Sequence, residues 1–548
     1  MRRHKDFVAV LLVNVFFLLL CVVLGKLRYG ALDDFFMAGV LSGIHGDAYN
    51  PHLYFVNALY GYALLPFYLL FPKVGWYYIF EMLGIFTSFV SVSFVIVKKL
   101  GFSSGLLLST ILLSLLSSDL YLGIQFTLCA VFFSVAGMLA ILYGLNAKKC
   151  IAVVAGCLLL FWGSLMRWSA FLMGLPIFFV LLLFNLNELK FRKKIVSIVF
   201  VVISLLVVGA HHFDRVLYDT DEYRPYKEIQ GPRAAFGDAS HYNMQAVYED
   251  LEEVGKSGMD YGMLTSWMFY DTENFRVDSL RKILKYVDYY KNEFRAAGVL
   301  WNLKGPLESL SGFPIFWVYI ILCVALFMGN YRKYPFVFFS LGYALCLMAY
   351  LLYLGRLWYR VELGIWLYAS LLTVPLLKKR YEFSKKFSLI IVAELLLVNI
   401  GVFWQLGDWA REPDRGLLYR VDEDKKDYTP VFKYIEDNPD KIFLVGMPTY
   451  MAFAGHRNPP YLSEPTGGFK RVVSFGYWTP YLPEITQSLK DFGITNPLKD
   501  VVKDNVVVVD VPNISDYLQM HYYDSVSVRV INKINDVTFY KYSVEDKR

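Results

Sequence analysis

The sequence predicts an all-α polytopic membrane protein with an external insert and a C-terminal α/β domain outside the membrane. Hydrophobic residues make up 56% of the 548 residues and charged residues 19%, whereas soluble proteins average about 45–50% and about 25%. The mean hydropathy is +0.41, and long apolar runs recur along the chain. Aromatic residues reach 18%, as is typical of chains whose rings line membrane interfaces.

Membrane-crossing helices need roughly 17–25 mostly apolar residues. By this criterion we expect about eleven spans, at 7–24, 76–97, 104–121, 125–146, 150–166, 168–185, 195–211, 313–329, 336–353, 363–377 and 387–405. We interpret the first as a retained helix, because no small-residue cleavage site follows it and further spans do.

Basic clusters fix the predicted orientation. With these spans, all of them fall on one side: Arg2/Arg3/Lys5, Lys98/Lys99, Lys148/Lys149, Lys190/Arg192/Lys193/Lys194, Arg332/Lys333 and Lys378/Lys379/Arg380. The positive-inside rule assigns that side to the cytoplasm, so we expect a cytoplasmic N-terminus and an extracytoplasmic C-terminus in the cell membrane. The net charge of +6 therefore reports topology, and we expect no nucleic-acid partner.

One apolar segment, 54–71, does not fit this count. If it crossed the membrane, the lysine pairs at 98–99 and 148–149 would move outside. Pro66, Pro72 and several tyrosines favour an interfacial or re-entrant helix instead.

Four parts of the chain follow from this map. Residues 1–211 form an N-terminal transmembrane module with a long first outer loop, 212–312 an external insert, 313–406 the remaining spans and 407–548 an external domain. The insert has helical spacing over 277–297. In the tail we expect a helix at 428–438, buried strands at 441–446 and 506–511, and a closing strand pair at 525–531 and 537–542.

The adjacent acids Asp33 and Asp34 come just after the first span. Carboxylates at a bilayer edge are costly and therefore call for a function. Either one is a candidate general base for an acceptor hydroxyl, or a ligand of a divalent cation. The alternative is that Asp33 or Asp34 caps a helix over 35–44. Both interpretations can hold, because one acid can cap the helix while the other serves as the base or cation ligand.

Asp119 lies at the outer end of the third span, which returns it to the same face. It is a candidate second acid that completes a metal site with Asp33 and Asp34 or orients an acceptor. The alternative is a solvated loop acid.

Arginines also gather at the outer face. Arg356 and Arg360 are four residues apart, so a helix would place both on one side. Arg suits bidentate phosphate binding, and Arg167 lies at the same face. The alternative for Arg360 is an ion pair with Glu362. His45, His52 and Tyr359 are candidates for lining the site or contacting the acceptor.

Other features exclude several classes of protein. All six cysteines lie in or beside apolar segments, which argues against a disulfide framework or a cysteine metal site. There is no glycine-rich phosphate loop ending in Lys-Ser/Thr, which argues against an ATP-driven pump.

The first two-fifths of the chain resembles the GT-C class of integral membrane glycosyltransferases, such as bacterial aminoarabinose transferases and protein O-mannosyltransferases. The likeness rests on the run from Asp33-Asp34-Phe-Phe to His45-Gly-Asp47, followed by Tyr54-Phe-Val-Asn57 and the second span. It implies that Asp33 or Asp34 is the catalytic base and that Asp119 occupies the second acidic position. The stretches 241–243, 260–267 and 271–273 resemble an insert of uncharacterised bacterial polytopic membrane proteins.

The resemblance implies an inverting transferase that moves a sugar from a polyprenyl-phosphate donor to a cell-surface glycan, glycolipid or protein at the outer face. In this interpretation Arg356, Arg360 and Arg167 hold the donor phosphate, and a divalent cation (Mg or Mn) is a possible cofactor. Membrane lipids, the lipid-linked donor and the acceptor are the expected partners. The alternative function is a non-enzymatic translocase of glycans or lipids.

Overall fold

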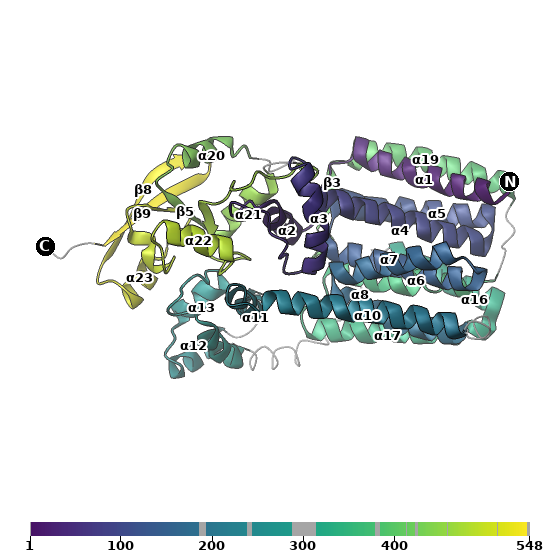
Figure 1. Ribbon diagram of the computed structural model, residues 1–548, viewed down its shortest axis with the longest axis horizontal. Coiled ribbons are helices and arrows are strands. Elements are labelled where there is room, and N and C mark those ends of the chain that lie inside the picture. Colours follow the sequence, from purple (N-terminus) through teal and green to yellow (C-terminus); the bar gives the residue numbers. More distant parts are fainter. Residues whose placement is uncertain are drawn as a thin grey trace.

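The computed structural model describes residues 2–185, 193–237, 244–287, 314–378, 384–412, 414–421, 426–456, 459–511 and 513–544. The molecule is elongated and has two parts (Figure 1). A bundle of long helices forms one half and contains the N-terminus at its far end. A mixed helix and sheet region forms the other half and carries the C-terminus.

Helices form at all eleven ranges where spans are expected. They are α1 (Arg2–Leu24), α4 (Trp76–Leu100), α5 (Phe102–Ser117), α6 (Phe126–Ala147), α7 (Cys150–Met166), α8 (Trp168–Phe184), α10 (Lys193–Tyr218), α16 (Pro314–Asn330), α17 (Pro335–Tyr353), α18 (Tyr359–Leu371) and α19 (Lys385–Leu406). The third expected span continues past α5 as a π-helical turn, η1 (Ser118–Leu122).

Within the described residues, 8 helices are long and apolar enough to cross a membrane. The helices at the other three expected spans are shorter than these eight: α7 and α8 have 17 residues each and α18 has 13. A short 3-10 turn, η5 (Val374–Leu376), follows α18. Because residues 362–371 of α18 are all buried, this helix lies inside the bundle, and its neighbours separate it from lipid.

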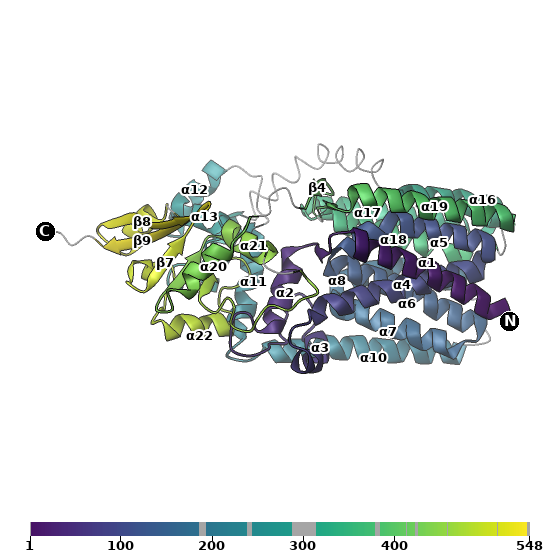
Figure 2. The same ribbon diagram turned by 90° about the horizontal axis from the view of Figure 1, so that it is seen from above.

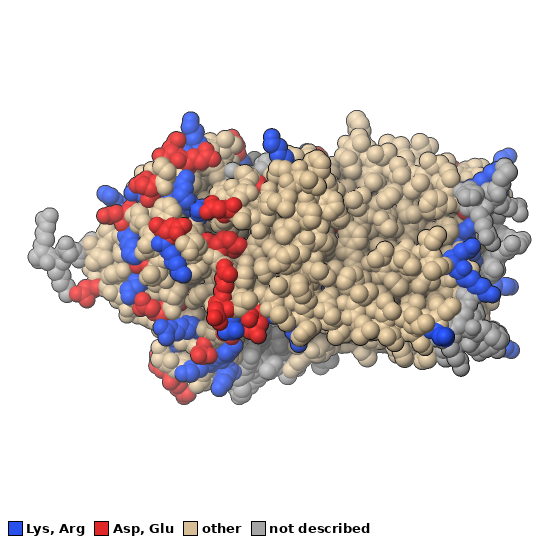
Figure 3. Space-filling model, in the orientation of Figure 1, with Lys and Arg blue, Asp and Glu red and all other residues tan. Residues whose placement is uncertain are grey.

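The outer surface of the bundle is apolar. On α10, for example, Val201, Leu205 and Val208 are exposed. On the face seen in Figure 3, a broad band of the bundle carries no charged side chains, and charges gather toward its two ends. Such a surface is compatible with a multi-pass membrane protein, because lipid tails can cover it without desolvating charge.

The end of the bundle that carries the N-terminus is basic in this view (Figure 3). Lys98 is 2.6 Å from Asp6, which places the end of α4 beside the start of α1. The segment 54–71 contains α3 (Ala58–Leu70), which lies across the opposite end of the bundle (Figures 1 and 2). Asp214 of α10 accepts a hydrogen bond from the first N–H of α3, at 2.8 Å.

The insert consists of short helices outside the bundle. They are α11 (Arg224–Gly237), α12 (Met244–Glu253), α13 (Gly258–Thr265) and a helix over 277–287. The expected helix 277–297 therefore forms over its described part, and residues 288–297 lie outside the described residues. The expected boundary at 211 was wrong, since α10 continues to Tyr218.

The tail forms the expected small α/β domain. Its elements are β3 (Trp409–Arg411), β4 (Leu418–Arg420), α20 (Thr429–Glu436), β5 (Ile442–Val445), α21 (Met447–His456), β6 (Val472–Ser474), α22 (Pro483–Asp491), η6 (Lys499–Val502), β7 (Val506–Val509), α23 (Ser515–His521), β8 (Val526–Ile534) and β9 (Val537–Val544). Five strands pair in the order β6-β5-β7-β9-β8, and β8 and β9 are antiparallel as expected. β3 and β4 form a separate hairpin beside the bundle.

The insert and the tail pack together. Asp271 of the insert accepts hydrogen bonds from Tyr517 and Tyr522 of the tail, both at 2.7 Å. The backbone N–H of Phe269 donates to the carbonyl of Phe475 at 3.1 Å. Two regions that we expected as separate domains therefore form one outer layer over the first loop.

Candidate functional site

A two-strand pairing positions the first outer loop. β1 (Arg28–Tyr29) runs parallel to β2 (Gly123–Ile124), just before α6. Gly30 follows β1, and a Cβ atom there would lie 2.5 Å from the carbonyl oxygen of Gly123, so this close approach requires glycine. The acids of helix α2 (Leu32–Ser42) are thereby held against the start of α6.

Asp34 points into this junction and is fully buried. Its Oδ1 accepts hydrogen bonds from the backbone N–H of Phe126 at 3.0 Å and from the Tyr77 hydroxyl at 3.2 Å. Asp34 thus satisfies an N–H at the start of α6. The alternative that Asp33 or Asp34 caps a helix over 35–44 is wrong, because α2 begins at Leu32 with Ala31 at its N-cap position. Burial and the neighbouring Asp33 carboxyl raise the pKa of Asp34, which favours a neutral side chain at this position.

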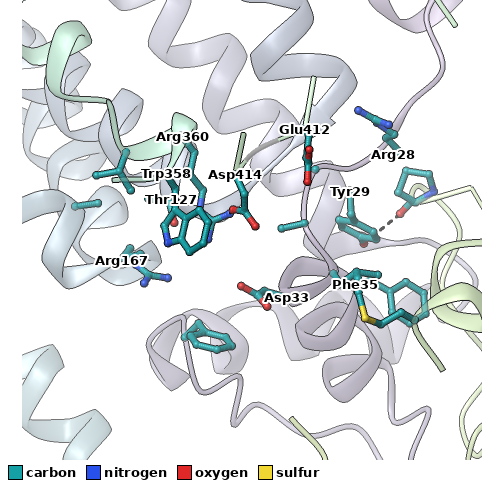
Figure 4. Close-up of a pocket in the computed structure, with 18 of the residues that line it drawn as sticks. Arg28, Tyr29, Asp33, Phe35, Thr127, Arg167, Trp358, Arg360, Glu412 and Asp414 are labelled. Atoms are coloured by element: carbon teal, nitrogen blue, oxygen red, sulfur yellow. Dashed lines mark hydrogen bonds and ion pairs between the residues drawn. The ribbon is translucent and has the colours of Figure 1, made fainter. Parts of the chain in front are cut away.

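Asp33 points the other way, into a cavity of about 1830 Å³ (Figure 4). Its side chain is half-buried. Burial raises its pKa, and the fields of Arg360, Arg167 and Arg233 oppose that rise. A raised pKa makes Asp33 a better proton acceptor than an ordinary aspartate. The two adjacent acids therefore occupy different environments.

The cavity lies between the bundle, the β3–β4 hairpin, the insert and the tail. Three acidic and seven basic side chains line it: Asp33, Glu412 and Asp414, with Lys26, Arg28, Arg167, Arg233, Arg356, Arg360 and Arg420. An excess of guanidinium groups in a partly desolvated space favours an anionic ligand.

The structure brings all three candidate arginines to this cavity. Arg167 lies in the break between α7 and α8, and its side chain faces the cavity near Asp33 (Figure 4). Arg360 lies in the first turn of α18. Arg356 lies in the loop before it, where Gly355 has a φ of 67° and α17 has already ended. The expectation that Arg356 and Arg360 share a helical face was therefore wrong, although both line one cavity.

Arg360 forms an ion pair with Asp414 of the β3–β4 hairpin. The backbone N–H of Tyr359 also donates to the carbonyl of Asp414, at 2.8 Å. The sequence analysis considered Glu362 as the ion-pair partner of Arg360. The ion pair with Asp414 joins Arg360 to the β3–β4 hairpin. The carboxylate of Asp414 shows that an anionic group fits against Arg360 within the cavity.

Asp119 and Tyr359 lie outside this cavity. Asp119 accepts a hydrogen bond from the Tyr359 hydroxyl at 2.9 Å and lies 3.4 Å from Nε of Arg411. Both line a second space of about 180 Å³. Asp119 is thus a largely buried, paired acid that anchors the β3–β4 hairpin, and it is neither a solvated loop acid nor a neighbour of Asp33 in the large cavity.

The two histidines are also outside the cavity lining. His45 is buried, with Nε2 3.4 Å from the Tyr450 hydroxyl, and burial lowers its pKa to about 3. His52 stacks on Tyr223 with ring centres 4.0 Å apart, and burial lowers its pKa to about 4. Both are therefore neutral side chains that pack in the outer layer.

The acidic side chains near the cavity do not form a metal-binding site. In the described part of the chain, no three His, Cys, Asp or Glu side chains cluster as metal ligands. The expectation that Asp33, Asp34 and Asp119 jointly hold a metal fails because Asp34 faces α6 and Asp119 faces Arg411.

The sequence interpretation missed several lining residues. Arg233 comes from the insert, and Tyr477 and Trp478 come from the tail. No motif in the sequence marks them, because their place at the cavity depends on contacts between segments more than 200 residues apart.

Comparison with known proteins adds no assignment to this geometry. No family model matches the chain, and no curated protein and no solved structure matches it.

Proposed function

We propose that this protein is a GT-C-like glycosyltransferase that moves a sugar from a polyprenyl-phosphate donor to an acceptor at the outer face of the membrane. The observation that supports this proposal is a cavity at one end of an apolar bundle that Asp33 lines together with Arg167, Arg356 and Arg360. An acid that can accept a proton and a group of cations that can hold a phosphate are the two requirements of this transfer.

In the proposed reaction the acceptor hydroxyl gives its proton to the Asp33 carboxylate while its oxygen attacks the anomeric carbon. The bond between that carbon and the phosphate oxygen breaks, and the phosphate leaves with the electron pair. Arg360, Arg356 and Arg167 stabilise the charge that develops on the phosphate. Attack from the side opposite the leaving group gives inversion.

A lipid-linked donor is supported by the wall on the bundle side. Leu172 and Met173 of α8 and Leu347 and Leu351 of α17 line the cavity there. Leu172 is also 39% exposed. A prenyl chain can lie along this apolar wall while its phosphate meets the arginines, since apolar area and guanidinium groups adjoin.

The test is release of polyprenyl phosphate from a panel of polyprenyl-monophosphate sugars by the full chain in proteoliposomes. We expect one donor to be consumed by the wild type and not by Asp33→Asn. The alternative function, a translocase, predicts that labelled lipid crosses the bilayer without release of polyprenyl phosphate. Release that persists in Asp33→Asn would overturn the assignment of the base.

A further inference from the structure

One wall of the cavity alternates aromatic rings and cations. The guanidinium of Arg167 lies 6.0 Å from the ring centre of Phe55, and the Phe55 ring lies 4.5 Å from that of Trp478. Arg233 is 3.7 Å above Trp478 and 5.3 Å from Trp267. We call these five residues the aromatic wall. It runs from the bundle to the insert and the tail.

Arg233 is the unusual member of the aromatic wall. It is 0% exposed and it borders the cavity. Its Nε donates to Gln230 at 2.7 Å, but its Nη1 is buried without a hydrogen-bond partner. Among the described residues no carboxylate forms an ion pair with it. Burying an unpaired guanidinium is costly, so an anion that enters here would gain a charge-assisted hydrogen bond.

Along the aromatic wall, the rings of Phe55 and Trp478 lie between Arg167 and Arg233. Arg360 and Arg356 approach from α18 and the loop before it, on the bundle side, where the apolar wall for a lipid chain also lies. Asp33 comes from α2, between the bundle and the outer layer (Figure 1). A donor phosphate on the bundle side therefore leaves the part near Arg233 to the other substrate.

We propose that the part of the aromatic wall formed by Arg233, Trp267 and Trp478 is the acceptor subsite and that it takes an acidic saccharide, while Arg167, at the bundle end of the wall, belongs to the donor side. The carboxylate of a uronic-acid residue would bind Arg233, which is held over the ring of Trp478, and the apolar face of a sugar ring would lie on the half-buried Trp267. Aromatic walls with a few fixed polar groups are typical of small-molecule sites, and a guanidinium fork matches a carboxylate in shape and charge. This inference rests on the proposed function, because it places the acceptor beside Asp33.

The first measurement compares acids with their neutral esters. Glucuronate, galacturonate and mannuronate oligosaccharides and their methyl esters are titrated against the full chain in nanodiscs, with tryptophan fluorescence as the signal. We expect at least one acid to bind at least 10-fold more tightly than its ester. If every acid and ester pair binds alike, or none binds, the proposal is wrong.

Variants then assign the preference to Arg233. Arg233→Gln should reduce the ratio of acid to ester affinity to near one, and Arg233→Lys should keep part of it. The matched control is Arg224→Gln on the same helix, an exposed arginine paired with Asp219 and Asp221, which should leave the ratio unchanged. If Arg233→Gln does not fold, an unchanged ratio in Arg233→Lys overturns the proposal.

A lipid phosphate is the other possible anion for Arg233. If saturating polyprenyl phosphate displaces the acidic saccharide and Arg233→Gln weakens both equally, Arg233 belongs to the donor site and the acceptor subsite is wrong. Asp33→Asn separates this inference from the proposed function. This variant should still bind the acid more tightly than its ester while releasing no polyprenyl phosphate. The preference for the acid and the transfer of sugar can therefore fail separately.

Discussion

The carboxylate of Asp34 accepts a hydrogen bond from the backbone N–H of Phe126 at 3.0 Å, across 92 residues of sequence. This contact joins the first outer loop to the start of α6. Asp33, the preceding residue, lines the cavity. The pair of acids is thus divided into one that holds the loop and one that faces a ligand space.

We predict opposite outcomes for these two acids. Asp33→Asn should lower sugar transfer by about 10²–10⁴, the usual contribution of a general base, with little change in melting temperature. Asp34→Asn should keep most of the transfer, because an amide oxygen can still accept the N–H of Phe126. Transfer rate and melting temperature are measured on the same purified samples.

Asp34→Ala is the matching stability test. It leaves the N–H of Phe126 without its partner, which should cost about 1–3 kcal/mol of unfolding free energy. A normal melting temperature for Asp34→Ala, or loss of transfer in folded Asp34→Asn, would contradict the division of roles.

The ion pair between Arg360 and Asp414 leads to a second prediction. A donor phosphate that binds Arg360 has to replace the carboxylate of Asp414. Arg360→Ala should therefore weaken binding of polyprenyl phosphate strongly, and Arg360→Lys should restore only part of it, because Lys lacks the guanidinium fork. Asp414→Asn should bind the lipid more tightly than the wild type, since the competing charge is gone.

Binding and melting temperature are again measured together. If Arg360→Ala and Asp414→Asn both lower stability and leave lipid affinity unchanged, the ion pair is structural and the phosphate role of Arg360 is wrong.

The sequence predicted the positions of the bundle helices and of four strands of the five-stranded sheet, because hydropathy and strand patterning are local properties. The runs 442–445 and 506–509 are unbroken apolar residues and form β5 and β7. β6 has three residues, too few for a pattern, and it was missed. The span expected at 363–377 was already short, and α18 has 13 residues; what the sequence did not predict is that this helix is buried among the other helices.

At the site, Asp33 was predictable because an acid at the membrane edge is rare. Its cavity partners were predictable only in part. Arg356 and Arg360 were expected for the wrong reason, since Gly355 and the end of α17 interrupt the helix between them. Arg233 was not predictable, because its burial depends on Trp478, which is 245 residues away in the chain.

Topology gives a third prediction. In a chain without its native cysteines, Lys149→Cys should be protected from a membrane-impermeant thiol reagent added outside, and Asp491→Cys should react. Both side chains are exposed at opposite ends of the molecule, so a difference in labelling reports the membrane. Labelling of Lys149→Cys from outside would mean that the orientation, and with it the outer site, is reversed.

The pH dependence of transfer gives the last prediction. Asp33 acts as a base in its ionised form, so the rate should rise with pH through its pKa, which burial places above that of an ordinary aspartate. The cations near Asp33 stabilise the carboxylate and hold this pKa down. Arg167→Gln removes one of them, so the acidic limb of the pH–rate profile, measured at saturating donor, should move to higher pH.

The control is Arg281→Gln, which removes an exposed arginine paired with Asp278 and should leave the acidic limb in place. A limb that moves to lower pH in Arg167→Gln, or that persists in Asp33→Asn, would show that another group titrates and that Asp33 is not the base.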